Sequence, residues 1–213
     1  MVSYLRTVGL FALALGLAQL GPSPAWAGMR SSDGFSAQER ARLEAGELVA
    51  RPRSQRRGAL NLTGGTSFQV IDAPPDVVWA ALLDTGNYPH TMPRVLEARV
   101  VGRGPDSRTV YVRQGAAGLI ERSYYLNIKH DAERRDITFV IDDSRPHDVK
   151  AAWGFYTVRP HGAQRTLIGY GVMADVGGGL LTRIAGSSMQ EWMLRPPNML
   201  KGFIERAGGG AYR

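Results

Sequence analysis

VIDAPPDVVWAALLDTGNYPHTMP, residues 70–93, sets out the order of elements at the start of the fold. A β-type run ends at Asp72, and two prolines follow it. Proline is excluded from the middle of a sheet but suits the first turn of a helix. Apolar residues then recur at helical spacing until Asp84. The stretch therefore predicts a strand, a short apolar helix and, over residues 87–92, a single helical turn that Pro93 ends.

Strand-like segments dominate the rest of the chain up to Val176. Short turns separate them, and no helical pattern intervenes, which predicts antiparallel pairing rather than parallel βαβ units. The expected strands are 66–71, 95–101, 109–114, 119–130, 137–141, 150–159 and 165–176, with a short first strand at 47–51 and a loop at 54–58.

A long apolar stripe follows the last predicted strand. Gly177–Gly179 interrupts the strand pattern, and apolar residues then recur at i, i+1, i+4 and i+5 from Leu180 to Met193. This spacing predicts a helix with one apolar face. Pro196-Pro197 should kink or break that helix, and a second segment extends the stripe until it fades at Gly208.

Three local matches resemble the START-like (SRPBCC) superfamily, and in particular its polyketide cyclase/coenzyme Q-binding branch. The first is Asp72-Ala73-Pro74 followed by Val78-Trp79, and the second is Tyr88-Pro89 followed by Met92-Pro93-Arg94-Val95. The third is Trp153-Gly154-Phe155, with Pro160 and Thr166 beyond it. The resemblance implies an α+β helix-grip fold, in which a bent antiparallel sheet wraps around a long C-terminal helix, here kinked or broken at Pro196-Pro197. The domain is expected to span residues 47–207, with a flexible tail at 208–213.

The amino-terminal residues have the pattern of an export signal. Arg6 supplies a positive charge, an apolar run follows from Val8 to Leu20, and Ala25-Trp26-Ala27 places small residues where a signal peptidase cleaves. We expect residues 1–27 to be a signal peptide cleaved near Ala27-Gly28, and the mature protein to be periplasmic or secreted. Residues 28–46 should form a flexible start and a short helix with a capping box at Ser36–Glu39.

Composition narrows the possible functions. The chain has no cysteine, which excludes a thiol nucleophile and a cysteine metal site. The net charge is +7, and part of the excess lies in one cluster made of Arg51, Arg53, Arg56 and Arg57. This cluster is either a solvated loop or a transient contact with an anionic membrane. No nucleic-acid motif is present, so we expect no nucleic-acid partner.

Strand parity suggests which side chains face the C-terminal helix. Alternate residues of a half-buried strand point to opposite faces. Aromatic and methionine side chains on the inward face would form either a packed core or the adaptable lining of an apolar cavity. The resemblance favours the cavity, and the expected ligand-binding residues are Tyr88, Met92, Tyr111, Arg113, Tyr124, Phe139, Trp153, Phe155, Tyr170, Leu181, Ile184 and Met189.

Few residues suggest catalysis. Arg113 would be buried among aromatic side chains and would need a partner, either Glu121 or a polar group of the ligand. His90, Arg113 and Tyr124 are the candidate catalytic residues if the protein is an enzyme. No paired-histidine spacing is present, so no metal site is expected, and no cofactor motif is found.

These patterns favour an exported carrier that holds a hydrophobic small molecule, such as a lipid, a quinone, a sterol-like compound or a polyketide. Entry would be gated by the C-terminal helix and the Tyr88–Met92 turn. The alternatives are a cyclase/aromatase or dehydratase-like enzyme that uses the same cavity, and a module that binds anionic membrane surfaces.

Overall fold

The computed structural model describes residues 34–115, 121–177, 186–208 and 212 of the 213-residue chain. The predicted signal peptide, the ligand-binding candidates Leu181 and Ile184, and most of the predicted flexible tail lie outside these residues.

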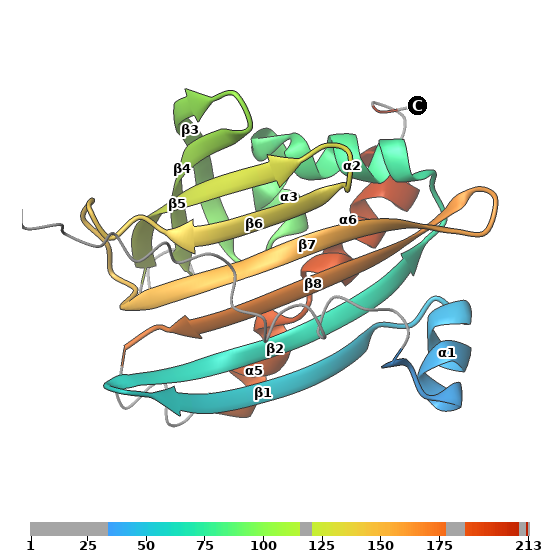
Figure 1. Cartoon of the computed structure of the whole chain (residues 1–213), viewed down its shortest axis with the longest axis horizontal. Helices are drawn as coiled ribbons and strands as arrows, with labels where there is room; N and C mark the ends of the chain where they lie inside the picture. Colours follow the sequence, from blue (N-terminus) through green and yellow to red (C-terminus); the bar gives the residue numbers. More distant parts are fainter. Residues whose placement is uncertain (1–33, 116–120, 178–185, 209–211, 213) are drawn as a thin grey trace, which may run out of the picture.

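One eight-stranded antiparallel sheet forms the frame of the molecule (Figure 1). Its order is β1-β2-β8-β7-β6-β5-β4-β3, so every strand from β3 to β8 pairs with its neighbour in sequence, while β2 pairs with β8. The strands are β1 (Val49–Arg57), β2 (Leu60–Ile71), β3 (Val95–Gly104), β4 (Ser107–Gly115), β5 (Glu121–Asp131), β6 (Asp136–Ile141), β7 (Ala151–His161) and β8 (Arg165–Asp175).

Most helices cover one face of this sheet, which we call the inner face (Figure 1). The described helical segments are α1 (Ala37–Glu44), α2 (Pro75–Leu83), η3 (Thr85–Asn87), α3 (Tyr88–Thr91), α5 (Gly186–Met193), α6 (Pro196–Phe203) and η4 (Ile204–Gly208). Pro75 occupies the first turn of α2, as its sequence predicts. The predicted break in the C-terminal helix is confirmed, because α5 ends at Met193 and α6 begins at Pro196.

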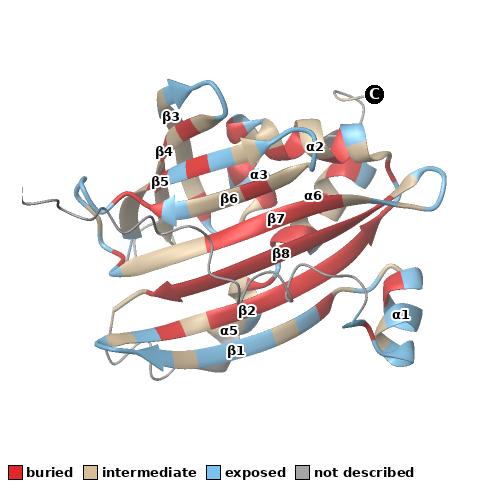
Figure 2. Ribbon diagram, in the orientation of Figure 1, coloured by how far each residue is buried: buried red, intermediate tan, exposed pale blue. Residues whose placement is uncertain are grey.

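Two apolar clusters lie on opposite faces of the sheet. The main core fills the inner face between the strands and α2, α3 and α6, and includes fully buried Ile71, Val78 and Ile168. A smaller cluster lies under α1 on the other face, the outer face, where Phe35 packs edge-on against Phe68. Figure 2 shows the resulting pattern, with buried residues along most of β8 and the middle of β7, and mostly exposed ones along β1.

The predicted strands from residue 95 onward are confirmed to within a few residues. The loop expected at 54–58 is wrong, because β1 continues to Arg57 and pairs with β2 along its whole length. Charged and polar residues are common on edge strands, where they discourage pairing with another chain. The capping box at Ser36–Glu39 is present, with hydrogen bonds in both directions. None of the described helices is long and apolar enough to cross a membrane.

Candidate functional site

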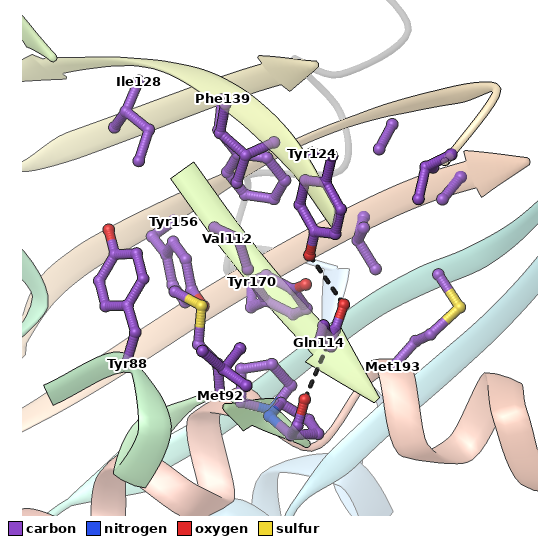
Figure 3. A pocket seen from close by; sticks show the side chains of 18 of the residues that line it. Tyr88, Met92, Val112, Gln114, Tyr124, Ile128, Phe139, Tyr156, Tyr170 and Met193 are labelled. Atoms are coloured by element: carbon purple, nitrogen blue, oxygen red, sulfur yellow. Dashed lines mark hydrogen bonds between the residues drawn. The ribbon is translucent and has the colours of Figure 1, made fainter. Parts of the chain in front are cut away.

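A cavity of about 130 Å³, partly open to solvent, lies between the inner face of the sheet and the C-terminal helices (Figure 3). Apolar and aromatic side chains form most of its wall. They come from every inner strand from β3 to β8, and from α2, α3, α5 and α6. The lining residues are Leu82, Tyr88, Met92, Pro93, Val95, Val112, Gln114, Tyr124, Leu126, Ile128, Ile137, Phe139, Val149, Ala152, Tyr156, Tyr170, Val172, Ala174, Val176, Met189, Trp192, Met193 and Pro196.

A short chain of hydrogen bonds crosses the cavity wall. The Tyr124 hydroxyl donates to Gln114 Oε1 over 2.7 Å, and Gln114 Nε2 donates to the Pro93 carbonyl over 2.7 Å (Figure 3). Because both polar groups of the Gln114 amide are engaged, its orientation is defined. The chain ties β5 and β4 to the turn that follows α3, so it holds one side of the cavity in place.

Three tyrosines lie together in the cavity wall, of which Tyr156 and Tyr170 are buried and Tyr124 is partly buried. The Tyr156 and Tyr170 rings lie 4.7 Å apart between centroids, and Phe139 packs 6.3 Å from each of them. Burial raises the pKa of Tyr124, Tyr156 and Tyr170 above the ordinary value of 10.0. These hydroxyls are therefore neutral at physiological pH and offer the cavity hydrogen-bonding groups without charge.

Arg108 lies beside Tyr88, behind the residues that line the cavity. It points to the inner face because it occupies the same side of β4 as cavity-lining Val112 and Gln114, and it is 9% exposed. Its Nη1 donates to the Leu83 carbonyl at the end of α2. Burial raises the pKa of Tyr88, while the neighbouring Arg108 and Thr85 lower it by a smaller amount.

The inward orientation predicted for Tyr111 and Arg113 is wrong. Burial alternates along β4 so that Arg108, Val110 and Val112 face inward, and Tyr111 and Arg113 face outward. Arg113 pairs with Glu121 at 2.9 Å and with Glu97 at 3.4 Å, on the two neighbouring strands. Tyr111 packs against Tyr125 and under the Arg99 guanidinium. These contacts satisfy both residues on the outer face, so neither reaches the cavity.

Trp153 and Phe155 also lie on the outer face, contrary to prediction. Gly154 and Tyr156 occupy the inward positions of β7 instead, and a Cβ on Gly154 would lie 2.3 Å from Phe139 Cζ. The missing side chain at Gly154 leaves room for the Phe139 ring on the inner face. Phe155 is fully buried on the other side, over Gly171.

The remaining described candidates do lie on the cavity: Tyr88, Met92, Tyr124, Phe139, Tyr170 and Met189. Gln114, Tyr156 and Trp192 also line it, although they were not selected as site residues. Tyr156 is the neighbour of the predicted residue Phe155. An assignment of inward residues that is shifted by one position selects the opposite face of the strand, so Phe155 was chosen in place of Tyr156. No sequence signal distinguishes Gln114 from an ordinary surface glutamine.

The other candidates lie away from the cavity. His90 is exposed on α3, where its ring stacks on Phe203 of α6 with centroids 6.0 Å apart.

Within the part of the chain that the structure describes, no group of three or more acidic or histidine side chains is placed to hold a metal ion. Arg51 of the basic cluster forms a bidentate pair with Glu39 and lies over the rings of Phe35 and Phe68.

The helix α5 is held over the cavity by polar contacts with the sheet edge. Gln190 Nε2 donates to the carbonyls of Arg53 and Gly64, each over 2.9 Å. On the cavity side, α5 presents Met189, Trp192 and Met193. Trp192 also lies under the exposed Arg94 guanidinium, 5.1 Å from its ring centroid.

Solved structures resemble this architecture. A protein from Thermus thermophilus matches with a TM-score of 0.58 and 17% identity, covering 70% of this chain and 98% of its own. The Zhui aromatase/cyclase from a Streptomyces species matches with a TM-score of 0.54 and 19% identity, covering 70% and 98%. The STAR-related lipid transfer protein from Xanthomonas axonopodis matches with a TM-score of 0.56 and 16% identity, covering 74% and 99%. At these identities the likeness establishes the helix-grip fold.

No curated protein matches the chain. The family model described as polyketide cyclase/dehydrase and lipid transport matches residues 65–196, which is more than half of the 213 residues. The match begins inside β2, runs through β3 to β8 and ends at the start of α6, so it includes the cavity-lining residues but not β1. The chain belongs to the polyketide cyclase/dehydrase and lipid transport family.

Proposed function

We propose that this protein binds a hydrophobic small molecule in the cavity between the sheet and the C-terminal helices. The observation that carries the proposal is the cavity wall itself, which is apolar and aromatic with a few placed hydroxyl and amide groups. This composition is typical of small-molecule sites. Each 100 Å² of apolar ligand surface buried there would contribute about 2.5 kcal/mol before the costs of binding.

The cavity volume bears on the size of the ligand. An apolar cavity of about 150 Å³ accommodates benzene, so about 130 Å³ corresponds to roughly one aromatic ring. A lipid, quinone or polyketide would extend beyond that space or require α5 to move. We propose that α5 and the Tyr88–Met92 turn gate entry, with the Gln190 contacts holding the closed position.

The positions of the candidate catalytic residues favour holding a ligand over converting it. His90 and Arg113 lie outside the cavity, and Tyr124 is neutral because burial raises its pKa. A general base works best when its pKa is near the operating pH. The cyclase or dehydratase-like alternative would depend on Tyr124 and Gln114, whose hydrogen bond could orient a substrate oxygen.

Ligand capture tests the proposal directly. Native mass spectrometry of protein purified from its own host should reveal a bound small molecule, and titration with a panel of lipids and quinones should give saturable binding. Repeated recovery of empty protein together with no binding across the panel would contradict it. Turnover of a polyketide substrate that is lost in Tyr124→Phe, with the fold intact, would favour the enzyme.

We also propose that the protein is exported, on the basis of the signal-like pattern of residues 1–27. The mass of the protein recovered from the host would show whether cleavage has occurred near Ala27. Membrane binding through the basic cluster is the weaker alternative, because Arg51 is already paired with Glu39. Arg56 and Arg57 are exposed at the β1–β2 hairpin, and salt-sensitive binding to anionic liposomes would favour that alternative.

A further inference from the structure

The Tyr88 end of the cavity holds a buried cation whose hydrogen-bonding capacity is mostly unused. Arg108 has five N–H donors, and its Nη1 donates to the Leu83 carbonyl. Among the described residues, its Nε and Nη2 are buried without a hydrogen-bond partner, and so is Thr85 Oγ1. Both residues lie beside Tyr88, which lines the cavity. Unpaired polar atoms are therefore concentrated directly behind Tyr88, at one end of the cavity.

The charged groups around this corner have both signs. Arg103 lies opposite Arg108 in the register of β3 and β4 but is exposed to solvent. Asp84 is negatively charged and accepts hydrogen bonds from the Gly86 amide and the Tyr212 hydroxyl, and its charge affects the pKa of Tyr88 less than the charge of Arg108 does. Tyr156, also close to Tyr88, is neutral. No ion pair to Arg108 is found within the described residues.

A buried cation without an anionic partner is costly, and an anion supplied by a ligand would offset that cost. We propose that the Tyr88–Arg108 corner is the polar end of the ligand site and selects a ligand with an acidic oxygen, such as a phenol, an enol or a carboxylic acid, in its ionised form. The Tyr88 hydroxyl would donate to that oxygen, and the Arg108 charge would stabilise it from behind. This inference rests on the proposed function, because it assumes that the cavity binds a ligand.

A pair of single-ring probes that fit the cavity separates the two ideas. Nitrobenzene tests binding of the ring and the nitro group, while 4-nitrophenol adds an acidic oxygen whose ionised form absorbs visible light. We expect the pKa of bound 4-nitrophenol to lie about one unit below that of the free probe, which corresponds to about tenfold tighter binding of the ionised form. An apolar cavity without a cation would shift the probe's pKa upward instead.

Three variants assign the effect to this corner. Arg108→Met should abolish the preference for the ionised probe, and nitrobenzene binding measured on the same variant checks that the cavity is retained. Tyr88→Phe should weaken the preference. Arg113→Met, on the outer face of the same strand, is the matched control and should retain it. If Arg108→Met does not fold, the wild-type shift and the Tyr88→Phe result decide.

The outcomes are distinct. Nitrobenzene binding without any preference for ionised 4-nitrophenol, or a preference that persists in Arg108→Met, would overturn this inference and leave the proposed function standing. The unpaired nitrogens would then be hydrated rather than reserved for a ligand. Failure of the wild type to bind either probe would overturn both.

Discussion

The two faces of β4 carry similar residues that the fold uses in opposite ways. Arg108 on the inner face is buried and, among the described residues, mostly unpaired, whereas Arg113 on the outer face is paired with Glu97 and Glu121. A partly exposed arginine paired with two carboxylates contributes little to stability. A buried, unpaired one is unfavourable by itself and therefore points to a functional role. The chemistry of the residue is the same, and its environment decides what it does.

The largest effect expected from this difference between faces concerns stability. Ile168 is fully buried on the inner face, whereas Val140 on the outer face is 48% exposed. Ile168→Ala should lower the free energy of unfolding by about 2–5 kcal/mol through lost burial and a residual cavity. Val140→Ala should change it by no more than about 0.5 kcal/mol. Equal losses in chemical denaturation would show that the inner face is not the principal core.

Two glycines sharpen the comparison, because each makes room for an aromatic ring on one face. A Cβ on Gly154 would lie 2.3 Å from inner-face Phe139, and one on Gly171 would lie 2.3 Å from outer-face Phe155. Either alanine variant should lower stability by about 1–3 kcal/mol through overpacking. Only Gly154→Ala should also weaken ligand binding, because Phe139 lines the cavity. A binding loss of the same size in Gly171→Ala would contradict this division.

The cover of the inner face provides a smaller test. Gln190→Ala removes the hydrogen bonds from α5 to the Arg53 and Gly64 carbonyls. We expect a loss of about 1 kcal/mol in stability and faster ligand dissociation in stopped-flow measurements. The control is Gln55→Ala, at a half-buried position of β1, the edge strand that also contains Arg53. Unchanged dissociation from Gln190→Ala would exclude the proposed role of these contacts in gating.

The smallest expected effect is a response of the outer face to acid. The hydrogen bonds of Arg51 to the Glu39 carboxylate lower its pKa from 4.5 to about 2. A lowered folded-state pKa gives stability that is present above pH 4.5 and is lost as the pH falls toward 2. Hydrogen exchange of α1 should therefore accelerate over that range in wild type, and Glu39→Gln should remove the dependence. Burial raises the pKa of the inner-face tyrosines, such as Tyr170, so the stability that depends on their neutral hydroxyls is lost only above about pH 10.

How far the sequence predicts this molecule depends on the range of the signals. Prolines, turns and apolar spacing are local, and they predicted α2, the strands from β3 to β8 and the break at Pro196. The loop predicted at 54–58 was wrong because the polar edge strand β1 has no apolar alternation beyond Val49. Its pairing with β2 stabilises it, and a long-range contact of that kind leaves no local pattern.

The site was predicted less completely than the fold. The side chains predicted to point inward were correct on β5, β6 and β8, where Tyr124, Phe139 and Tyr170 reach the cavity. On β4 and β7 both alternating sets contain plausible core residues, so the larger aromatic and arginine side chains were assigned inward. Small Val110, Val112 and Gly154 took those positions instead. The unpaired state of Arg108 follows from three-dimensional packing alone.

A ligand in the inner-face cavity should be detectable on the purified protein and should disappear when the cavity is filled. Native mass spectrometry should compare three proteins purified from the host: wild type, Ala152→Trp and Val140→Trp. Ala152 lines the cavity, so its replacement should fill the space, whereas Val140 lies exposed on the outer face. A small-molecule adduct on wild type and Val140→Trp that is absent from folded Ala152→Trp is the predicted result. The same adduct on all three proteins, or on none, would show that the inner-face cavity does not hold the ligand.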